Sequence, residues 1–274
     1  MVAPLRRVLV RRPATTGDFI GAGWRVPEPS TLLTQHDAFC ALLQSLGCEV
    51  AIAPAVDGLV DAVYMYDSAF VIGSGAIALR SAKPARVKER EHAMMAIGAA
   101  GLPVVGSLEG TACCDGGDML FLDESTLVVG RGYRTNAEAH RQLAPILHRD
   151  GITLERVDLP HDRGEAHVLH TMSFISPVTD DLAVTFPPLM PVPLVEMLAE
   201  RGIRQIHVDA AEYASMGCNV LATAPGVVVM VDGNPRTRRA LEEAGCEVHV
   251  YDGSELSLKG DGGPTCLTRP LWRS

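Results

Sequence analysis

Apolar and polar positions along the chain alternate between two patterns, one typical of strands and one typical of helices. The apolar run Leu5 to Val10 predicts a strand, and the apolar residues of Thr34 to Leu46, which recur at helical spacing, predict an amphipathic helix. Gly47 follows that helix, at the place where a glycine commonly ends one. Between these elements, Arg11 to Ser30 carries frequent glycine and proline and predicts a long, functional loop.

The same order of elements then recurs in repeated units of hairpin, helix and strand. The expected hairpins are Tyr64–Gly73 with Ala76–Arg80, Asp118–Leu122 with Thr126–Gly130, Met172–Pro177 with Leu182–Phe186, and Asn219–Thr223 with Val227–Val231. The expected helices are Ala85–Ala100, Asn136–His148, Pro193–Arg201 and Pro235–Ala244, and the strands after them are Val104–Val105, Leu154–Val157, Gln205–Val208 and Glu247–Tyr251. A recurring unit is the signature of a repeat architecture, whereas a doubly wound fold alternates single strands with helices.

The first strand and the last predicted strand, Cys266–Arg269, both lack a hairpin partner. If they pair with each other, the chain closes into a ring of five ββαβ units, with residues near Val8 beside residues near Leu267. We therefore predict an α/β fold, a five-bladed propeller with pseudo-fivefold symmetry, formed by one domain over residues 1–274.

Composition narrows the functional classes. Hydrophobic residues make up 47% of the 274 residues but aromatic residues only 5%, so the core must be mainly aliphatic. The net charge of −9 argues against nucleic acid or an anionic membrane as partner and suits a small cationic substrate. The seven cysteines have no regular spacing, which argues against a disulfide framework and so favours a reducing, cytoplasmic compartment. The same lack of spacing argues against a zinc site. No run of about 18 apolar residues is present to span a membrane.

Polar residues stand where the first strand of each unit is expected to begin, near the axis of the ring. They are Tyr66 and Asp67, Asp115 and Asp118, His170, Asn219, and Cys266. Burying a thiol, an imidazole and carboxylates together is costly unless they form a site. A thiolate beside an acid/base, with carboxylates to bind a planar cation, describes attack on an amidine carbon. Structural alternatives are that Asp115 and Asp118 only form a Gly-Gly turn, and that Cys266 is a small buried hydrophobe.

Several sequence blocks resemble a known family. The blocks are Asp61 to Asp67, Asp115-Gly-Gly-Asp118, Val129 to Asn136, Leu169-His170 and Gly262-Gly-Pro-Thr-Cys266. Together they are similar to the guanidino-group-modifying enzymes, or penteins, and among these most similar to dimethylarginine dimethylaminohydrolases. That resemblance covers nearly the whole chain and implies a five-bladed fold, in agreement with the repeat.

The resemblance also implies roles for individual residues. Cys266 matches the nucleophile, His170 the general acid/base, and Asp115 the carboxylate that orients both His170 and the guanidinium. The residues placed by the resemblance in substrate binding are Asp61, Asp67, Arg86, Arg134, Tyr66 and Gly260, with the two arginines clamping the carboxylate of an amino-acid substrate. The chemistry implied needs no metal and no organic cofactor, and the resemblance leaves a homodimer open.

Three functions stay open at this point. The first is hydrolysis of N-methylated arginine to citrulline and an amine, through a covalent thiouronium on Cys266. Tyr66 stands where the family has a glutamate, which favours the second, a deiminase or amidinotransferase acting on another guanidine. The segments Gly217 to Val229 and Gly262 to Leu271 also read closer to arginine deiminases, although the chain lacks room for their extra helical domain. The third is a pentein that binds a ligand without catalysis.

Overall fold

The computed structural model describes all 274 residues, which form fifteen strands and six α-helices. The strands are β1 (Leu5–Arg11), β2 (Glu49–Ala53), β3 (Ala69–Ile72), β4 (Gly75–Ala78), β5 (Val104–Ser107), β6 (Met119–Phe121), β7 (Thr126–Arg131), β8 (Thr153–Asp158), β9 (Ile175–Thr179), β10 (Leu182–Thr185), β11 (Arg204–His207), β12 (Leu221–Ala224), β13 (Val227–Val231), β14 (Glu247–Tyr251) and β15 (Thr268–Arg273). The helices are α1 (Pro29–Ser45), α2 (Glu89–Ala99), α3 (Ala137–Arg149), α4 (Val192–Glu200), α5 (Ala210–Tyr213) and α6 (Pro235–Glu243).

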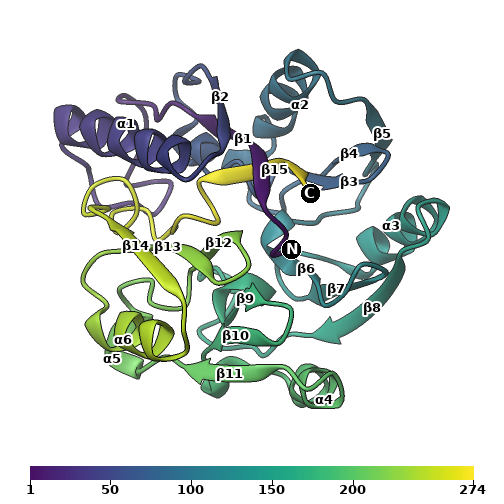
Figure 1. The fold of residues 1–274 in the computed structure, drawn as a ribbon. Helices are drawn as coiled ribbons and strands as arrows, with labels where there is room; N and C mark the ends of the chain where they lie inside the picture. Colours follow the sequence, from purple (N-terminus) through teal and green to yellow (C-terminus); the bar gives the residue numbers. More distant parts are fainter.

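The strands form five separate three-stranded sheets with the same topology. Their orders are β15-β1-β2, β3-β4-β5, β6-β7-β8, β9-β10-β11 and β12-β13-β14. In each sheet two antiparallel strands are followed, after a helix, by a third strand parallel to the central one. Figure 1 shows the sheets around a common centre and the helices around the outside.

The two ends of the chain complete one sheet. Strand β1 pairs antiparallel with β15, so that Val8 lies opposite Pro270 and Val10 opposite Thr268. The predicted pairing of the first and last strands is therefore confirmed. Strand β15 begins at Thr268 rather than at the predicted Cys266, which leaves Cys266 in the turn before the strand.

The first helix begins earlier than the hydrophobic pattern indicates. Glu28 is its N-cap residue and accepts hydrogen bonds from the backbone N–H groups of Ser30 and Thr31, and Pro29 occupies the first turn. These capping groups extend the helix beyond its apolar stripe, since a cap and an N-terminal proline both favour a helix start. The short helix α5, which the pattern does not predict, begins in the same way, with Asp209 as its cap.

Apolar side chains fill the space between the sheets and the outer helices. Phe39 and Leu43 of α1, for example, pack with Val8 of β1 in one cluster of fully buried residues. Central strands such as β4 and β10 are buried along their whole length. None of the helices has the length and apolar character needed to cross a membrane.

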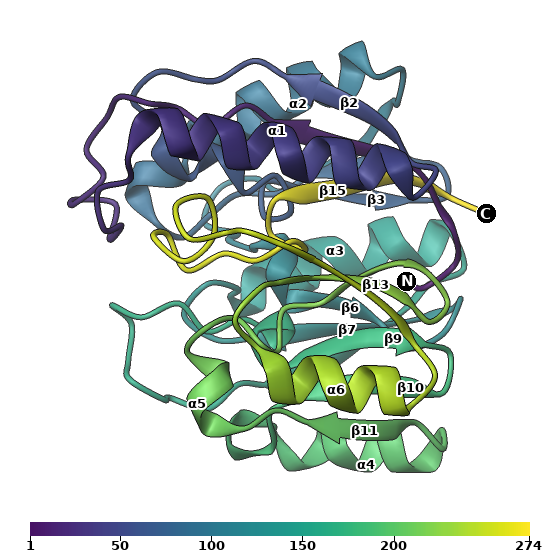
Figure 2. The ribbon, with the colours of Figure 1, turned by 60° about the vertical axis from the view of Figure 1, so that its left-hand side comes forward.

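Because the five sheets repeat one topology, their two kinds of turn lie on opposite faces of the molecule. The turn before the first strand of each sheet lies on one face, and the hairpin turns lie on the other. Figure 2 shows both chain ends on one side and the loop that leads into β15 on the opposite side. Asp67, Asp118, His170, Asn219 and Cys266 precede first strands or the short turns leading into them, so they share the face of that loop.

Candidate active site

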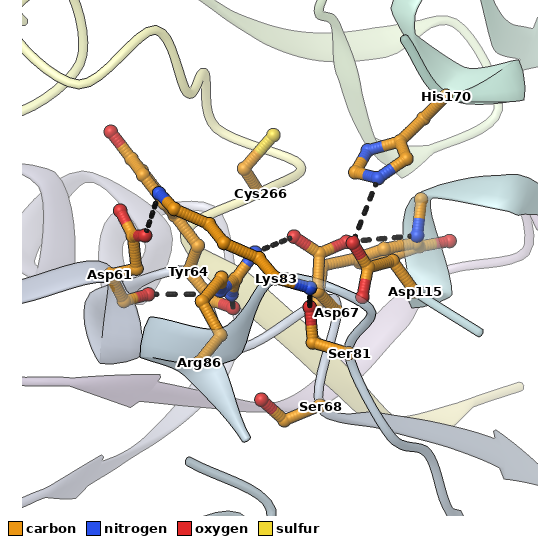
Figure 3. A network of polar contacts seen from close by, with 12 residues as sticks. Asp61, Tyr64, Asp67, Ser68, Ser81, Lys83, Arg86, Asp115, His170 and Cys266 are labelled. Atoms are coloured by element: carbon orange, nitrogen blue, oxygen red, sulfur yellow. Dashed lines mark hydrogen bonds and ion pairs between the residues drawn. The ribbon is translucent and has the colours of Figure 1, made fainter. Parts of the chain in front are cut away.

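Two carboxylates and an imidazole meet on this face. Side-chain atoms of Asp67, Asp115 and His170 all lie within 4.8 Å of one another, and all three residues are buried. His170 Nε2 lies 3.2 Å from Asp115 Oδ2. Each residue comes from a different sheet, because Asp67 precedes β3, Asp115 leads into β6 and His170 leads into β9 (Figure 3).

The carboxylates keep the imidazole protonated. Burial lowers the pKa of His170, but Asp67, the hydrogen bond to Asp115 and the charge of Asp118 outweigh it and raise the pKa to about 9. Asp118 is itself fully buried; burial raises its pKa to about 6, although it accepts hydrogen bonds from Thr135 Oγ1 and the Thr171 N–H. His170 is therefore an imidazolium at neutral pH and can donate a proton to a leaving group.

Cys266 lies beside this cluster, in the turn before β15. Asn219 Nδ2 donates a hydrogen bond to Cys266 Sγ at 3.2 Å, and Asn219 Oδ1 accepts one from the Thr265 N–H at 3.0 Å. Figure 3 shows the thiol and the His170 imidazole on the same side of the Asp67 carboxylate. Burial, followed by the charge of Asp67, raises the pKa of the thiol to about 11, so without a ligand Cys266 is a thiol.

Glycines allow the close approaches around these groups. A Cβ on Gly117 would lie 2.4 Å from His170 Nδ1, and one on Gly263 would lie 2.5 Å from Asn219 Cγ. Gly260, predicted to bind substrate, packs instead against the aromatic wall of the site, where a Cβ would lie 2.2 Å from Trp24 Cε2 and 2.3 Å from Tyr64 Oη. The close approach of these two rings requires glycine at position 260, and a substrate contact by Gly260 stays a prediction.

Asp67 is already paired with an arginine. Arg86 Nη1 donates to Asp67 Oδ2 at 2.7 Å, and the Gly117 N–H donates to Asp67 Oδ1 at 3.0 Å. The same guanidinium bonds Glu89, and burial raises the pKa of that carboxyl to about 7. Arg86 is expected from the sequence to clamp the carboxylate of the substrate, but here its charge is taken by two acidic side chains, because the turn Pro84–Arg86 directs it into the interior.

Asp61 is also fully paired, by two residues that sequence reasoning missed. Trp24 Nε1 donates to Asp61 Oδ1 at 2.7 Å, and Lys83 Nζ lies 2.5 Å from Asp61 Oδ2. Lys83 Nζ also donates to the carbonyl of Ala22 and so fastens the long loop before α1 to the site. Asp61 therefore holds the wall of the site rather than presenting a free oxygen. Only the rarity of tryptophan, of which the chain has two, could have singled out Trp24 in that loop as a site residue.

Two of the predicted site residues have polar atoms without a hydrogen-bond partner. Asp115 is completely buried, and its Oδ1 has no hydrogen-bond partner. Arg134 is only 8% exposed and makes no hydrogen bond or ion pair in the structure. A buried carboxylate oxygen without a partner is costly, and the Arg134 guanidinium nitrogens reach solvent with no acidic side chain paired to them, so the two groups suit the cationic end and the anionic end of a ligand.

Tyr66 does not belong to this cluster. Its ring packs beneath the Arg269 guanidinium, with Arg269 Cζ 3.9 Å from the ring centroid, and lines a cavity with Phe70 and Trp272. The structure therefore does not bring the Tyr66 side chain together with the predicted catalytic residues. Tyr66 immediately precedes Asp67, yet the turn that carries them sends the two side chains to different places.

The three-residue cluster also has a composition that metal ions use. Asp67, Asp115 and His170 could each offer one ligand atom. Both oxygens of Asp67 are nevertheless taken by Arg86 and Gly117, and a His170 with a pKa of about 9 has no lone pair to give at neutral pH. The donor set fits a planar organic cation better than a metal ion.

Comparison with known proteins identifies the family. The arginine deiminase family model matches residues 53–201 and 194–273. The chain belongs to the arginine deiminase family. The arginine deiminase of Listeria monocytogenes serotype 4a is 30% identical over 257 residues, which are 80% of this chain and 62% of the relative. That of Listeria welshimeri is 29% identical over 260 residues, 80% of this chain and 63% of the relative, so the chain spans less than two thirds of these relatives.

Solved structures show the same fold at lower identity. A structure of DDAH from Pseudomonas aeruginosa, complexed with citrulline, superimposes with a TM-score of 0.82 at 22% identity and covers 98% of this chain and 100% of that one. The N-terminal domain of ArgZ, described as a cyanobacterial arginine dihydrolase and bound to substrate, gives 0.84 at 19% identity, covering 97% and 98%. Both dimethylarginine dimethylaminohydrolase and arginine dihydrolase structures therefore share the fold of this arginine deiminase family member.

Proposed function

We propose that this chain is a catalytic pentein domain that hydrolyses a C–N bond of a guanidino compound through Cys266. The observation that carries the proposal is the unpaired Oδ1 of Asp115, buried beside a protonated His170 whose imidazole lies on the same side of Asp67 as the Cys266 thiol. A guanidinium is planar and presents several N–H donors, which match such a carboxylate. The five repeated sheets with the pairing of β1 and β15 support a pseudo-fivefold propeller as the scaffold.

The protonation states suggest that the substrate activates the nucleophile. Cys266 has a pKa near 11 and His170 one near 9, so the ligand-free site holds a thiol beside an imidazolium. A bound guanidinium adds a positive charge next to the thiol and lowers the thiol pKa, and the proton leaves to solvent since His170 already carries one. The resulting thiolate is the competent nucleophile.

The reaction then proceeds in two halves. Cys266 Sγ forms a bond to the guanidinium carbon, and the bond from that carbon to the leaving nitrogen breaks as His170 donates its proton to the departing amine. This leaves an S-alkylthiouronium on Cys266 and a neutral imidazole. His170 next accepts one proton from water, whose oxygen attacks the same carbon. As the C–S bond breaks, the remaining hydroxyl proton passes to the departing sulfur, which releases a neutral ureido product and restores the Cys266 thiol beside an imidazolium.

A carboxylate on the substrate is expected from Arg134. The Arg134 side chain is mostly buried, but its guanidinium nitrogens reach solvent and have no protein partner, whereas Arg86 is held by Asp67 and Glu89. A guanidino amino acid would place its cationic end at Asp115 and its anionic end at Arg134. In this mechanism the charge of Asp67 raises the His170 pKa, and Asp67 holds Arg86 by an ion pair unless the substrate displaces that arginine.

Two substrates of this class remain candidates. N-methylated arginine, which would give citrulline and methylamine or dimethylamine, follows from the sequence blocks similar to dimethylarginine dimethylaminohydrolases. Arginine, which would give citrulline and ammonia, is favoured by the family match over residues 53–201 and 194–273. Because Tyr66 lies outside the cluster, it cannot serve as the basis for choosing between them.

A panel of guanidino compounds tests the proposal. Arginine, dimethylarginine and agmatine, which lacks the carboxylate, would each be incubated with the protein and assayed for ureido product and released amine. We expect product from at least one amino acid, and Cys266→Ser to abolish turnover while retaining binding of that substrate. Cys113→Ser is the matched control, because Cys113 is the other cysteine that is not buried, and it should retain full activity.

The outcomes separate the alternatives. Tight binding without product from any compound would indicate a non-catalytic pentein. Full turnover by Cys266→Ser would move the nucleophile elsewhere and contradict the mechanism. If agmatine were turned over as well as arginine, with Arg134→Gln unchanged, the proposed carboxylate contact would be wrong.

A further inference from the structure

The face opposite the candidate active site contains a large cavity. Its volume is about 1270 Å³, and it is lined by the hairpin turns of several sheets together with β15 and the first residues of the chain. Since the candidate catalytic residues stand at the other ends of the same hairpins, this cavity is separate from the site described above. Figure 1 views the molecule with the two chain ends near its centre, on the side where this cavity lies.

Two arginines line the cavity without any acidic partner. Arg269 is 3% exposed and Arg273 is half-buried, and neither makes an ion pair. Burial, with a smaller contribution from the charge of Arg269, lowers the pKa of Arg273 to about 10. An arginine cannot relieve such a cost by losing its proton at neutral pH, and no acidic side chain forms an ion pair with either one.

Most N–H donors of these guanidinium groups are unused. Arg269 donates only from Nη1, to the carbonyls of Tyr66 and Ala69, and its Nε is buried without a partner. Arg273 donates to the carbonyls of Ala3 and Ala222. Each guanidinium offers five donors, and neutral carbonyls do not balance its charge.

Further features of the wall complete a built site. The hydroxyl of Tyr66 is buried and has no hydrogen-bond partner, and the Arg269 guanidinium packs against the rings of Tyr66 and Phe70, with Arg269 Cζ 3.9 and 5.2 Å from their centroids. The remaining lining is mostly apolar. Such a wall suits a ligand with an apolar body and an anionic end.

Acidic residues also line the cavity, mostly at exposed positions. Its acidic residues are Asp123, Glu124, Asp150 and Asp180. They would repel a polyanion such as a nucleotide or a phosphate more strongly than a single negative charge. We propose that this cavity is a second ligand site, which binds a small organic monocarboxylate through Arg269, Arg273 and the Tyr66 hydroxyl.

Calorimetric titration of the whole chain with hexanoate tests the proposal, with hexanamide as the uncharged counterpart. We expect saturable binding of hexanoate at one site and binding of hexanamide weaker by about tenfold or more. Arg273→Gln should weaken hexanoate binding by a similar factor and leave hexanamide unchanged. Arg273 is the residue to replace, because Arg269 is packed between rings and its loss could unfold the protein.

Two matched variants locate the carboxylate. Arg201→Gln removes a cation that also lines the cavity but is already paired with Asp123, so hexanoate affinity should change by less than about twofold. Arg134→Gln removes the unpartnered cation of the candidate active site and should also have little effect.

Several results would overturn the proposal. Hexanoate and hexanamide binding alike would mean that the cavity recognises no charge. Loss of hexanoate binding in Arg134→Gln, with Arg273→Gln unaffected, would place the anion in the other site. Tighter binding of inorganic phosphate than of hexanoate, or no heat from hexanoate up to about 10 mM, would also refute a monocarboxylate site.

Discussion

The hydrogen bond from Asn219 to Cys266 should set how reactive the thiol is. Asn219 Nδ2 lies 3.2 Å from Cys266 Sγ and favours the thiolate, which carries the charge that a donor stabilises. A hydrogen bond to a charged group is worth roughly 1.5–3 kcal/mol, which corresponds to about 1–2 pKa units. Asn219→Ala should therefore raise the thiol pKa from about 11 by that amount.

Alkylation by iodoacetamide measures this change, because only the thiolate reacts. Well below the thiol pKa, each unit of increase lowers the thiolate population tenfold, so the rate at pH 8 should fall by about 10- to 100-fold. The assay belongs in a Cys113→Ala background, since Cys113 is the only other cysteine that is not buried.

A second substitution separates the donor from the loop anchor. Asn219 Oδ1 also accepts the Thr265 N–H, so alanine removes both contacts. Asn219→Asp keeps an oxygen for Thr265, loses the donor and adds a negative charge, and should be at least as slow as Asn219→Ala. Wild-type rates in Asn219→Asp would show that Asn219 acts only by positioning the turn, and wild-type rates in both variants would refute the reasoning altogether.

Three further predictions follow from the buried charges. Asp118→Asn removes a charge that raises the His170 pKa, so the alkaline limb of kcat/KM, expected near pH 9, should move to lower pH; an unmoved limb would assign it to another group. The pKa of His170 is about 9 in the folded protein against an ordinary value of 6.5, so its stabilising contribution is complete below pH 6.5 and is lost as pH rises through 9. The difference in unfolding free energy between wild type and His170→Gln, measured by urea titration, should therefore shrink by about 3 kcal/mol from pH 6 to pH 10. A difference that stays constant over this range would contradict the prediction. Trp24→Phe leaves Asp61 short of a donor and should cost about 1–3 kcal/mol of unfolding free energy, whereas the exposed Trp272→Phe should cost less than about 0.5 kcal/mol; equal losses would argue against the Asp61 contact.

The sequence by itself determined the repeat and the pairing of the first and last strands. Strand and helix periodicities are local properties, so the hairpins, the third strands and every helix except α5 could be predicted, with boundaries within about five residues. The first and last strands were left without hairpin partners, which predicted that they pair with each other. Because equivalent positions in a repeat occupy equivalent places, the residues before the first strands could be assigned to one face. The repeat alone therefore places Asp67, Asp115, His170 and Cys266 on the same face of the molecule.

Only the tertiary structure decided which of these groups are free. Whether Arg86 reaches a substrate or Asp67 depends on how the turn at 84–86 enters the interior, and the pairing of Asp61 with Trp24 depends on where a loop without periodicity crosses the site. Such contacts join residues far apart in the chain through single hydrogen bonds, and no spacing in the sequence encodes them. The shifted pKa values of His170 and Cys266 have the same origin, since they arise from burial and from carboxylates of neighbouring sheets, which the fold alone brings within a few ångströms.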